Sequence, residues 1–203
     1  MIEFENYISS GERFMKHLLL AVSVAATLVL GGVRTVSAQD ALVIEKDSVF
    51  YVGVHSPTTV SAFDASTGEF IWSNSLATLC PGGQLHPAVM KDVVYVGCET
   101  SSGGGVAALR ADNGQVLWYT SLAQVYSSPT PEKDVIYLGS QTGVVAVDAN
   151  TGAIRWLTYL GVVGSSPVVQ KGVVYVGANG GANDYLTALD TTTGQILYQV
   201  VAP

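Results

Sequence analysis

The segment from Ala146 to Trp156, AVDANTGAIRW, decides the fold, because its pattern recurs three more times in the chain. The other copies begin at Ala62 (AFDASTGEFIW), Ala108 (ALRADNGQVLW) and Ala188 (ALDTTTGQILY). In each copy an apolar strand leads into a polar turn with a glycine, and a second apolar strand follows. This is the pattern of a β-hairpin in which side-chain oxygens bind turn amides and the glycine adopts a left-handed backbone conformation.

The four turn glycines follow one another at intervals of 46, 38 and 42 residues; they are Gly68, Gly114, Gly152 and Gly194. Repeats of about 40 residues are typical of propeller blades or of helical arrays. The hairpins and the β-branched and aromatic residues between them exclude the helical arrays. The repeats therefore predict the blades of a β-propeller.

One further element precedes every hairpin, and another precedes three of the four. One is a strand that ends in glycine, and it occurs as DSVFYVG from Asp47, DVVYVG from Asp92, DVIYLG from Asp134 and GVVYVG from Gly172. The other is marked by a proline, which a strand tolerates at its first residue because no ladder amide is needed there. It occurs as Ser127-Ser128-Pro129, Ser165-Ser166-Pro167 and Leu85-His86-Pro87. Each repeat is thus expected to contain four antiparallel strands.

An aromatic residue occupies the same place in the last strand of every repeat: Trp72, Trp118, Trp156 and Tyr198. Each lies four residues after the turn glycine, and hence on the same face of the strand. Because large aromatic side chains at a repeated position suit packing between repeats, we expect these residues to cover the gap to a neighbouring blade. Stacking on a ligand is the alternative.

The sequence therefore predicts an all-β protein of four four-stranded antiparallel blades within residues 39–203. The expected blades lie at about 40–78, 84–122, 125–161 and 163–202. These units resemble the pyrroloquinoline-quinone-like (PQQ-like) repeat family, with its Ala-x-Asp-x-x-Thr-Gly-x-x-x-Trp signature. The resemblance implies a propeller similar to the outer-membrane barrel-assembly scaffold lipoprotein and to quinoprotein dehydrogenases. Four blades are half of an eight-bladed ring, and the sequence leaves undecided how the two ends are completed. The alternatives are a tightly closed or partial propeller, a homodimer, and further blades beyond this sequence.

Residues 1–38 are expected to be an N-terminal extension and signal peptide. The apolar run Leu18–Leu30 follows Lys16 and precedes Val36-Ser37-Ala38, which suits cleavage after Ala38. The run is short for a hydrocarbon layer of about 30 Å. Met15 is an alternative start, and an uncleaved anchor is the alternative outcome. We expect an exported protein, periplasmic or extracellular, without a stable membrane span after cleavage.

The composition limits the classes of partner. The net charge is −7 and charged residues make up only 12% of the chain, so no basic patch for nucleic acid is expected. In an exported protein Cys80 and Cys98 can form a disulfide, and free buried thiols are the equal alternative.

Strand alternation separates the two ends of each blade into two faces of the propeller. One face carries nearly uniform turns, and these include Lys46, Lys91, Lys133 and Lys171. The other carries loops of variable length and sequence, a feature typical of interaction surfaces. The candidate ligand-binding residues of this loop face are His86, Ser128, Ser166, Glu99 and Asp184. No catalytic group and no metal site are expected, because the sequence lacks paired acid-base residues and metal-ligand motifs.

The leading functional hypothesis is an exported, non-catalytic binding or scaffolding protein with a protein or cell-envelope partner and no cofactor. The alternative implied by the resemblance is a PQQ-dependent dehydrogenase, or a fragment of one, with PQQ and calcium. The sequence departs from that alternative, since it has no adjacent-cysteine pair and no acidic cluster. A shared fold by itself does not carry an activity.

Overall fold

The computed structural model describes residues 41–46, 49–55, 57–179 and 184–201, and the predicted export segment 1–38 lies outside them. The described residues form sixteen strands and no helix, arranged in four four-stranded antiparallel sheets. The predicted all-β fold of four blades is therefore confirmed. Among these residues, no helix has the length and apolar character needed to cross a membrane.

Each sheet contains four strands that are consecutive in the chain, and we call the sheets blades 1 to 4. Blade 1 contains β1 (Ala41–Lys46), β2 (Val49–Val54), β3 (Thr59–Asp64) and β4 (Phe70–Ser75). Blade 2 contains β5 (Gln84–Met90), β6 (Val93–Thr100), β7 (Gly103–Arg110) and β8 (Val116–Leu122). Blade 3 contains β9 (Thr130–Glu132), β10 (Val135–Gly139), β11 (Gly143–Asp148) and β12 (Ile154–Tyr159). Blade 4 contains β13 (Val168–Gln170), β14 (Val173–Asn179), β15 (Asp184–Asp190) and β16 (Ile196–Val201).

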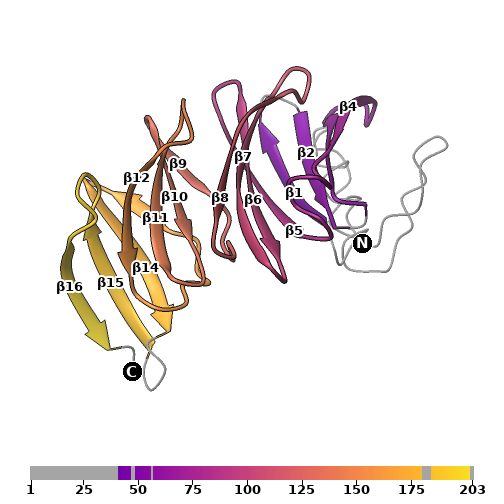
Figure 1. The fold of residues 1–203 in the computed structure, drawn as a ribbon. Helices are drawn as coiled ribbons and strands as arrows, with labels where there is room; N and C mark the ends of the chain where they lie inside the picture. Colours follow the sequence, from indigo (N-terminus) through magenta and orange to yellow (C-terminus); the bar gives the residue numbers. More distant parts are fainter. Residues whose placement is uncertain (1–40, 47–48, 56, 180–183, 202–203) are drawn as a thin grey trace, which may run out of the picture.

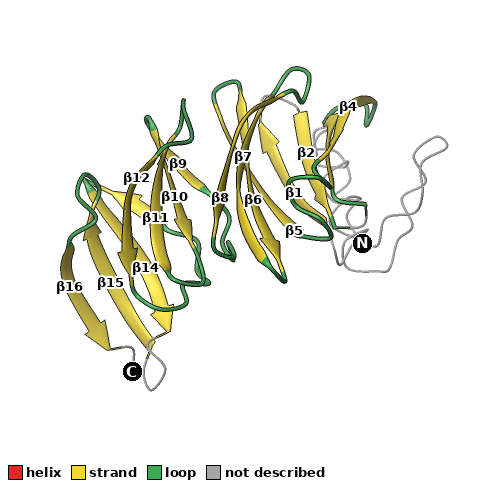
Figure 2. Cartoon of the chain, viewed as in Figure 1, coloured by secondary structure: helices red, strands yellow, loops and turns green. Residues whose placement is uncertain are grey.

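The blades follow one another in chain order, with blade 1 and blade 4 at opposite ends of the series (Figure 1). Strands and tight turns make up all of the described chain (Figure 2). The first strands of successive blades, β1, β5, β9 and β13, contact one another. The first strands therefore form the inner side of the series, and the fourth strands lie farthest from it.

The hydrophobic core is divided into three clusters, and each cluster lies between two successive blades. The first joins residues such as Val60 and Trp72 of blade 1 to Val96 of blade 2. The second joins blades 2 and 3, and the third joins blades 3 and 4. Because each blade buries its apolar residues against its neighbours, its stability depends on the blades beside it.

The third and fourth strands of every blade share one irregularity in register. The pairing shifts by one residue directly after the alanine that opens each repeated segment, for example between Ala146 and Val147. That alanine pairs with the aromatic residue of the last strand, as Ala146 does with Trp156. A small side chain opposite a large ring leaves room for the ring to lie across the sheet toward the next blade.

One local expectation was wrong. Proline was expected at the first residue of a strand, but Pro87 lies inside β5 and pairs with Val96, while Pro129 and Pro167 lie just before β9 and β13. The inner strand is an edge strand of its sheet. It therefore tolerates a residue without an N–H at positions where that group would point away from the ladder.

Candidate binding face

The antiparallel strand order puts two kinds of connection on opposite faces of the molecule. The turn face holds the connections from the first to the second strand and from the third to the fourth strand of each blade. The loop face holds the connections from the second to the third strand and the segments between blades. The chemistry of the two faces differs, and this difference locates the candidate binding surface.

On the turn face, the Asp carboxylates are used inside their own turns. Asp64 Oδ1 accepts hydrogen bonds from the amides of Ser66 and Thr67, both at 2.8 Å, and from both of their hydroxyls. Asp148 accepts bonds from the amides of Asn150 and Thr151 in the same way. Asp190 repeats this arrangement in blade 4. These side chains close the turns and leave few acceptors for a ligand.

The hydrogen bonds also change the acidity of these carboxyl groups. The hydroxyl of Ser66, together with the turn amides, lowers the pKa of Asp64 from 3.8 to about 2. The guanidinium of Arg155, followed by the turn donors, lowers the pKa of Asp148 to about 2. Hydrogen bonds from the amide and hydroxyl of Thr193 lower the pKa of Asp190. All three groups therefore remain ionised at neutral pH as structural acceptors.

The four blades are not identical on the turn face. Blade 2 has Arg110 in place of the turn aspartate, and it forms an ion pair with Asp112 at 2.6 Å. Arg155 in blade 3 binds both Asp134 and Asp148, also at 2.6 Å. The pair of Arg110 with Asp112 is largely exposed to solvent and contributes little to stability, whereas Arg155 and Asp148 are partly buried. Three of the turn lysines, Lys91, Lys133 and Lys171, have positive φ, which identifies them as tight-turn residues.

The connections of the loop face differ in sequence between blades, although those of blades 2 and 3 close in the same way. In blade 2 the hydroxyl of Thr100 donates to the carbonyl of Gly103 at 3.0 Å, and in blade 3 Ser140 donates to Gly143 at 2.9 Å. Gln124 reaches from the connecting segment to Thr100 O at 2.6 Å. The exposed polar residues beside these closed turns differ, for example Ser101 in blade 2 and Gln141 in blade 3. A surface of ordered loops with different exposed side chains suits recognition of a partner.

The structure brings two of the predicted residues together across a blade boundary. The amide of Ser128 donates to Ser166 Oγ at 3.2 Å, which joins the inner sides of blades 3 and 4. The serines that precede them have another role: Ser127 Oγ accepts from Gly139 N at 2.7 Å, and Ser165 Oγ accepts from Gly177 N at 2.8 Å. The first serine of the element thus closes its own blade, and the second faces a neighbouring blade.

His86 and Glu99 form a second pair, on adjacent strands of blade 2. His86 pairs with Gly97, and Gln84 pairs with Glu99, so the two side chains lie diagonally across β5 and β6. His86 is partly buried, and its Nε2 has no hydrogen-bond partner in the described part of the chain. Burial lowers the pKa of the imidazole, and the negative charge of Glu99 opposes that shift. The neutral form of His86 is therefore favoured at neutral pH.

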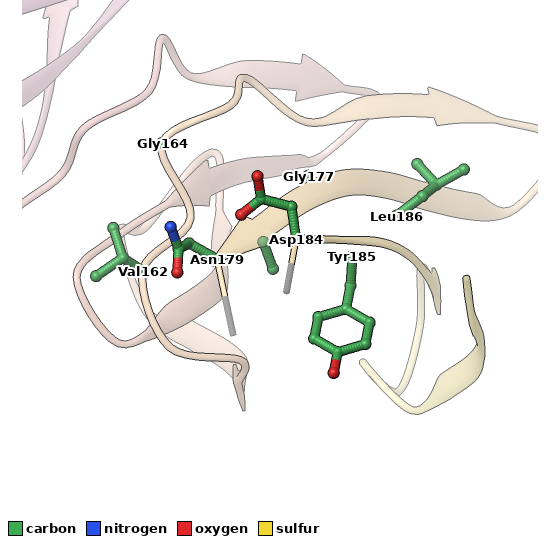
Figure 3. Close-up of a pocket in the computed structure, with 8 residues that line it drawn as sticks. Val162, Gly164, Gly177, Asn179, Asp184, Tyr185 and Leu186 are labelled. Carbon is green, nitrogen blue, oxygen red and sulfur yellow. The ribbon is translucent and has the colours of Figure 1, made fainter. Parts of the chain in front are cut away.

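Asp184 lies apart from the other predicted residues, at the start of β15 in blade 4. It lines a cavity of about 480 Å³ together with Val162, Gly164, Gly177, Ala178, Asn179, Tyr185 and Leu186. Figure 3 shows Val162 and Leu186 at opposite ends of this cavity, with Asn179 and Asp184 between them. The cavity is mostly apolar and lies where the blade series ends, so the five predicted residues do not form one pocket.

The two cysteines are joined in a disulfide, with their Cα atoms 6.1 Å apart. Cys80 belongs to the segment between blades 1 and 2, and Cys98 lies in β6 opposite Leu85. Both cysteines are buried in the first core cluster. The bond therefore fastens the connecting segment to the blade that follows it.

The described acidic residues do not gather into a calcium site. Calcium requires six to eight oxygen ligands, several of them from carboxylates. Within the described residues no group of three or more His, Cys, Asp or Glu side chains could hold a metal ion. Glu99 and Asp184, the acidic residues of the loop face, belong to blades 2 and 4. We therefore derive no chemistry through a metal or a quinone.

Sixteen strands in four repeated blades, closed by Asp turns and joined by tryptophans, define a β-propeller of PQQ-like repeats. The family described as outer membrane protein assembly factor BamB matches residues 56–156 and 127–203. The chain belongs to this family. A search of functionally curated proteins found no match.

Solved structures show the same architecture at low sequence identity. BamB from Moraxella catarrhalis is 23% identical with a TM-score of 0.61, over 80% of this chain and 54% of that chain. Quinohemoprotein alcohol dehydrogenase from Comamonas testosteroni is 18% identical with a TM-score of 0.64, over 78% and 34%. Sqt1 from Saccharomyces cerevisiae is 16% identical with a TM-score of 0.69, over 86% and 51%. The chain thus spans about half or less of these proteins, and the likeness concerns the fold.

Sequence reasoning missed the residues that line the cavity in blade 4, except for Asp184 and the glycines of the repeat. A signal was present, because Leu186 stands where blades 1, 2 and 3 have a buried valine (Val60, Val106 and Val144). Only the structure shows that none of the four described blades covers Leu186, which is 46% exposed.

Proposed function

We propose that this protein is an exported, non-catalytic scaffold that binds a protein partner of the cell envelope through its loop face. Membership in a family described as an outer membrane protein assembly factor supports the envelope setting. The apolar run followed by small residues near Ala38 supports export.

The observation that carries this proposal is the contrast between the two faces. The carboxylates of the turn face already accept two or more hydrogen bonds inside their own turns, as Asp64 and Asp148 do. The loop face presents a different set of groups in each blade, including the partly buried His86 and the exposed Gln141. A partner can therefore distinguish positions along the loop face by their exposed side chains, whereas three of the four turns on the turn face share one Asp arrangement.

Site-specific photo-crosslinking in the exporting cell tests this function. A photoreactive residue is placed at Ser101 or Gln141 on the loop face, and at Asn150 on the turn face as the matched control. All three positions are exposed and lie in turns, so their replacement should leave the blades intact. We expect discrete protein adducts from the loop-face positions and none from the control. Adducts from the turn face alone would overturn the proposal.

A separate titration tests the non-catalytic part of the proposal. The purified protein is mixed with PQQ and Ca²⁺, and tryptophan fluorescence is recorded. We expect no saturable change, because the described acidic residues do not form a calcium donor set. Saturable quenching at one quinone per chain, together with dye reduction in the presence of alcohols, would favour the dehydrogenase instead.

A further inference from the structure

The face of blade 4 that points away from blade 3 repeats an interface used three times inside the chain. Two rows of paired residues build it: Val168, Tyr175, Ala188 and Tyr198 in one row, and Gly177, Leu186 and Val200 in the other. Paired residues on neighbouring strands point to the same side of a sheet. We call this surface the open face.

In the interior blades the equivalent surface is covered by the next blade. Val60, Val106 and Val144, which correspond to Leu186, are fully buried. On the open face, Leu186 is 46% exposed, Tyr198 48%, Val200 53% and Val168 61%. Every strand of blade 4 except β14 thus contributes at least one large exposed apolar side chain to a single surface. Exposure of this apolar surface to water is unfavourable in free energy unless another surface covers it.

Three interior interfaces show what kind of surface covers this face. The tryptophan of one blade donates from Nε1 to a turn carbonyl of the next: Trp72 to Ala111, Trp118 to Ala149 and Trp156 to Thr191. A polar side chain two residues further donates to the carbonyl of the turn glycine, as Thr158 does to Gly194 at 2.6 Å. Tyrosine hydroxyls join the tryptophans, since Tyr95 and Tyr137 also donate to Ala149 O and Thr191 O at 3.3 Å.

The segment that leads into the next blade also fills a socket above a glycine. A Cβ on Gly97 would lie 3.1 Å from Val125 Cγ1, and a Cβ on Gly139 would lie 2.8 Å from Val163 Cγ1. Val125 and Val163 are fully buried in these positions. Above Gly177, the corresponding glycine of blade 4, the nearest atoms belong to Ser165 of the same blade. Gly177 and Leu186 both line the cavity of about 480 Å³, so this cavity includes the socket above Gly177.

Blade 1 carries the turn carbonyls that would complement the open face. Ala65 and Gly68 occupy the turn positions in blade 1 that Ala111 and Gly114 occupy in blade 2. Their carbonyl oxygens accept no hydrogen bond from the described residues. Tyr175 and Tyr198 carry hydroxyls on the open face that share a hydrogen bond with each other. The hydroxyl that accepts this bond keeps its own proton and can donate it to such a carbonyl, as Tyr95 and Tyr137 do inside the chain.

We propose that the open face of blade 4 docks onto blade 1 of a second copy of this chain, and that two such contacts close a ring of eight blades. A second copy fits this face because the new contact would repeat the three interfaces between successive blades. The exposed side chains of blade 4 would meet the turn carbonyls of blade 1 in the other copy. A heterologous contact made twice closes a ring when the rotation allows it. This contact lies at the end of the blade series, and the loop face stays available to a partner.

Light scattering after size exclusion tests the contact on the exported protein expressed from the full sequence. We expect a mass twice that of one chain, and the mass of one chain for the double variant Leu186→Lys/Tyr198→Lys. The matched control is Leu117→Lys/Tyr159→Lys, because Leu117 is 49% and Tyr159 75% exposed on outer strands away from the open face. The control should stay a dimer. A wild-type protein of single-chain mass, or a double variant that remains dimeric, would overturn the contact.

A cysteine cross-link tests the same contact without relying on a destabilising change. Val200 corresponds to Thr158, which lies against the turn glycine of the next blade. Chains with Val200→Cys are therefore co-expressed with chains carrying Glu69→Cys, which follows Gly68. We expect a covalent dimer on a non-reducing gel from the mixture and none from either variant alone. Absence of the dimer from the mixture, or its formation by Val200→Cys alone, would contradict the proposed geometry.

Discussion

Trp156 of blade 3 donates a hydrogen bond from its indole Nε1 to the carbonyl oxygen of Thr191 in blade 4, across 3.0 Å. The indole ring also lies against Gly194, where an added Cβ would come within 2.6 Å of it. The same arrangement joins blades 1 and 2 and blades 2 and 3. Each of these tryptophans thus fills the space between two blades and also forms a hydrogen bond across it. Its loss should therefore weaken the contact between the two blades.

Trp72→Ala should destabilise the protein by about 3–5 kcal/mol, because it removes a ring that is 94% buried between blades 1 and 2 and leaves a cavity there. Urea unfolding followed by circular dichroism measures this change. The control is Ile71→Ala, since Ile71 is the neighbouring residue and is 44% exposed. Its effect should be below about 1 kcal/mol. Equal losses in the two variants would contradict the packing role of Trp72.

Gly152→Ala should cost about 3 kcal/mol of unfolding free energy, because two penalties combine. Gly152 has φ of 76°, and a Cβ there would lie 2.7 Å from Trp118 Cε3. Gly82→Ala separates the penalties, since Gly82 has φ of 61° but nothing within 4 Å, and it should cost only about 1 kcal/mol. Gly164→Ala has neither penalty and should be neutral within about 0.5 kcal/mol. Any other order of the three variants would contradict this account.

The protein should lose stability in acid because of its turn carboxylates. The folded-state pKa of Asp64 and of Asp148 is about 2, below the ordinary value of 3.8. The unfolded chain therefore binds more protons, and the stabilisation is present above about pH 4 and lost as the pH falls toward 2. Urea midpoints at pH 7 and at pH 2.5 measure this loss.

Asp64→Asn should make the stability less dependent on pH, since the amide side chain keeps an acceptor oxygen but does not titrate. The difference in unfolding free energy between wild type and Asp64→Asn should be largest at pH 7 and should shrink toward pH 2. Glu69→Gln is the control, because no hydrogen bond to the Glu69 carboxylate is formed by the described residues. A wild-type pH profile unchanged by Asp64→Asn would refute the assignment.

Reduction of the Cys80–Cys98 disulfide should lower the unfolding free energy by about 3 kcal/mol, given a sequence separation of 18 residues. Dithiothreitol added to the folded protein before urea unfolding measures the effect. The double variant Cys80→Ala/Cys98→Ala is the control, because dithiothreitol should not change its midpoint. If wild type and variant respond alike, the bond does not stabilise the fold.

Several parts of the candidate site could not be read from the sequence. Ser128 and Ser166 were predicted as loop-face residues, but the contact between them depends on how two blades approach each other. The pairing of Gln84 with Glu99 places the carboxylate beside His86, and it follows from the register of β5 on β6. Asp184 proved separate from both pairs, because it belongs to the last blade of the series.

The repeat AVDANTGAIRW and its three relatives determined the four blades, because the interactions that form each hairpin join residues close together in the sequence. An Asp oxygen reaches amides two and three residues away, and a glycine accepts positive φ, whatever lies around the turn. The tertiary structure alone decided which residues of different blades and connecting segments meet. It settled which tryptophan meets which carbonyl, how Cys80 reaches Cys98, and that no blade among the described residues covers Leu186. Whether a side chain is buried depends on the blade beside it, so the sequence of one repeat does not determine it.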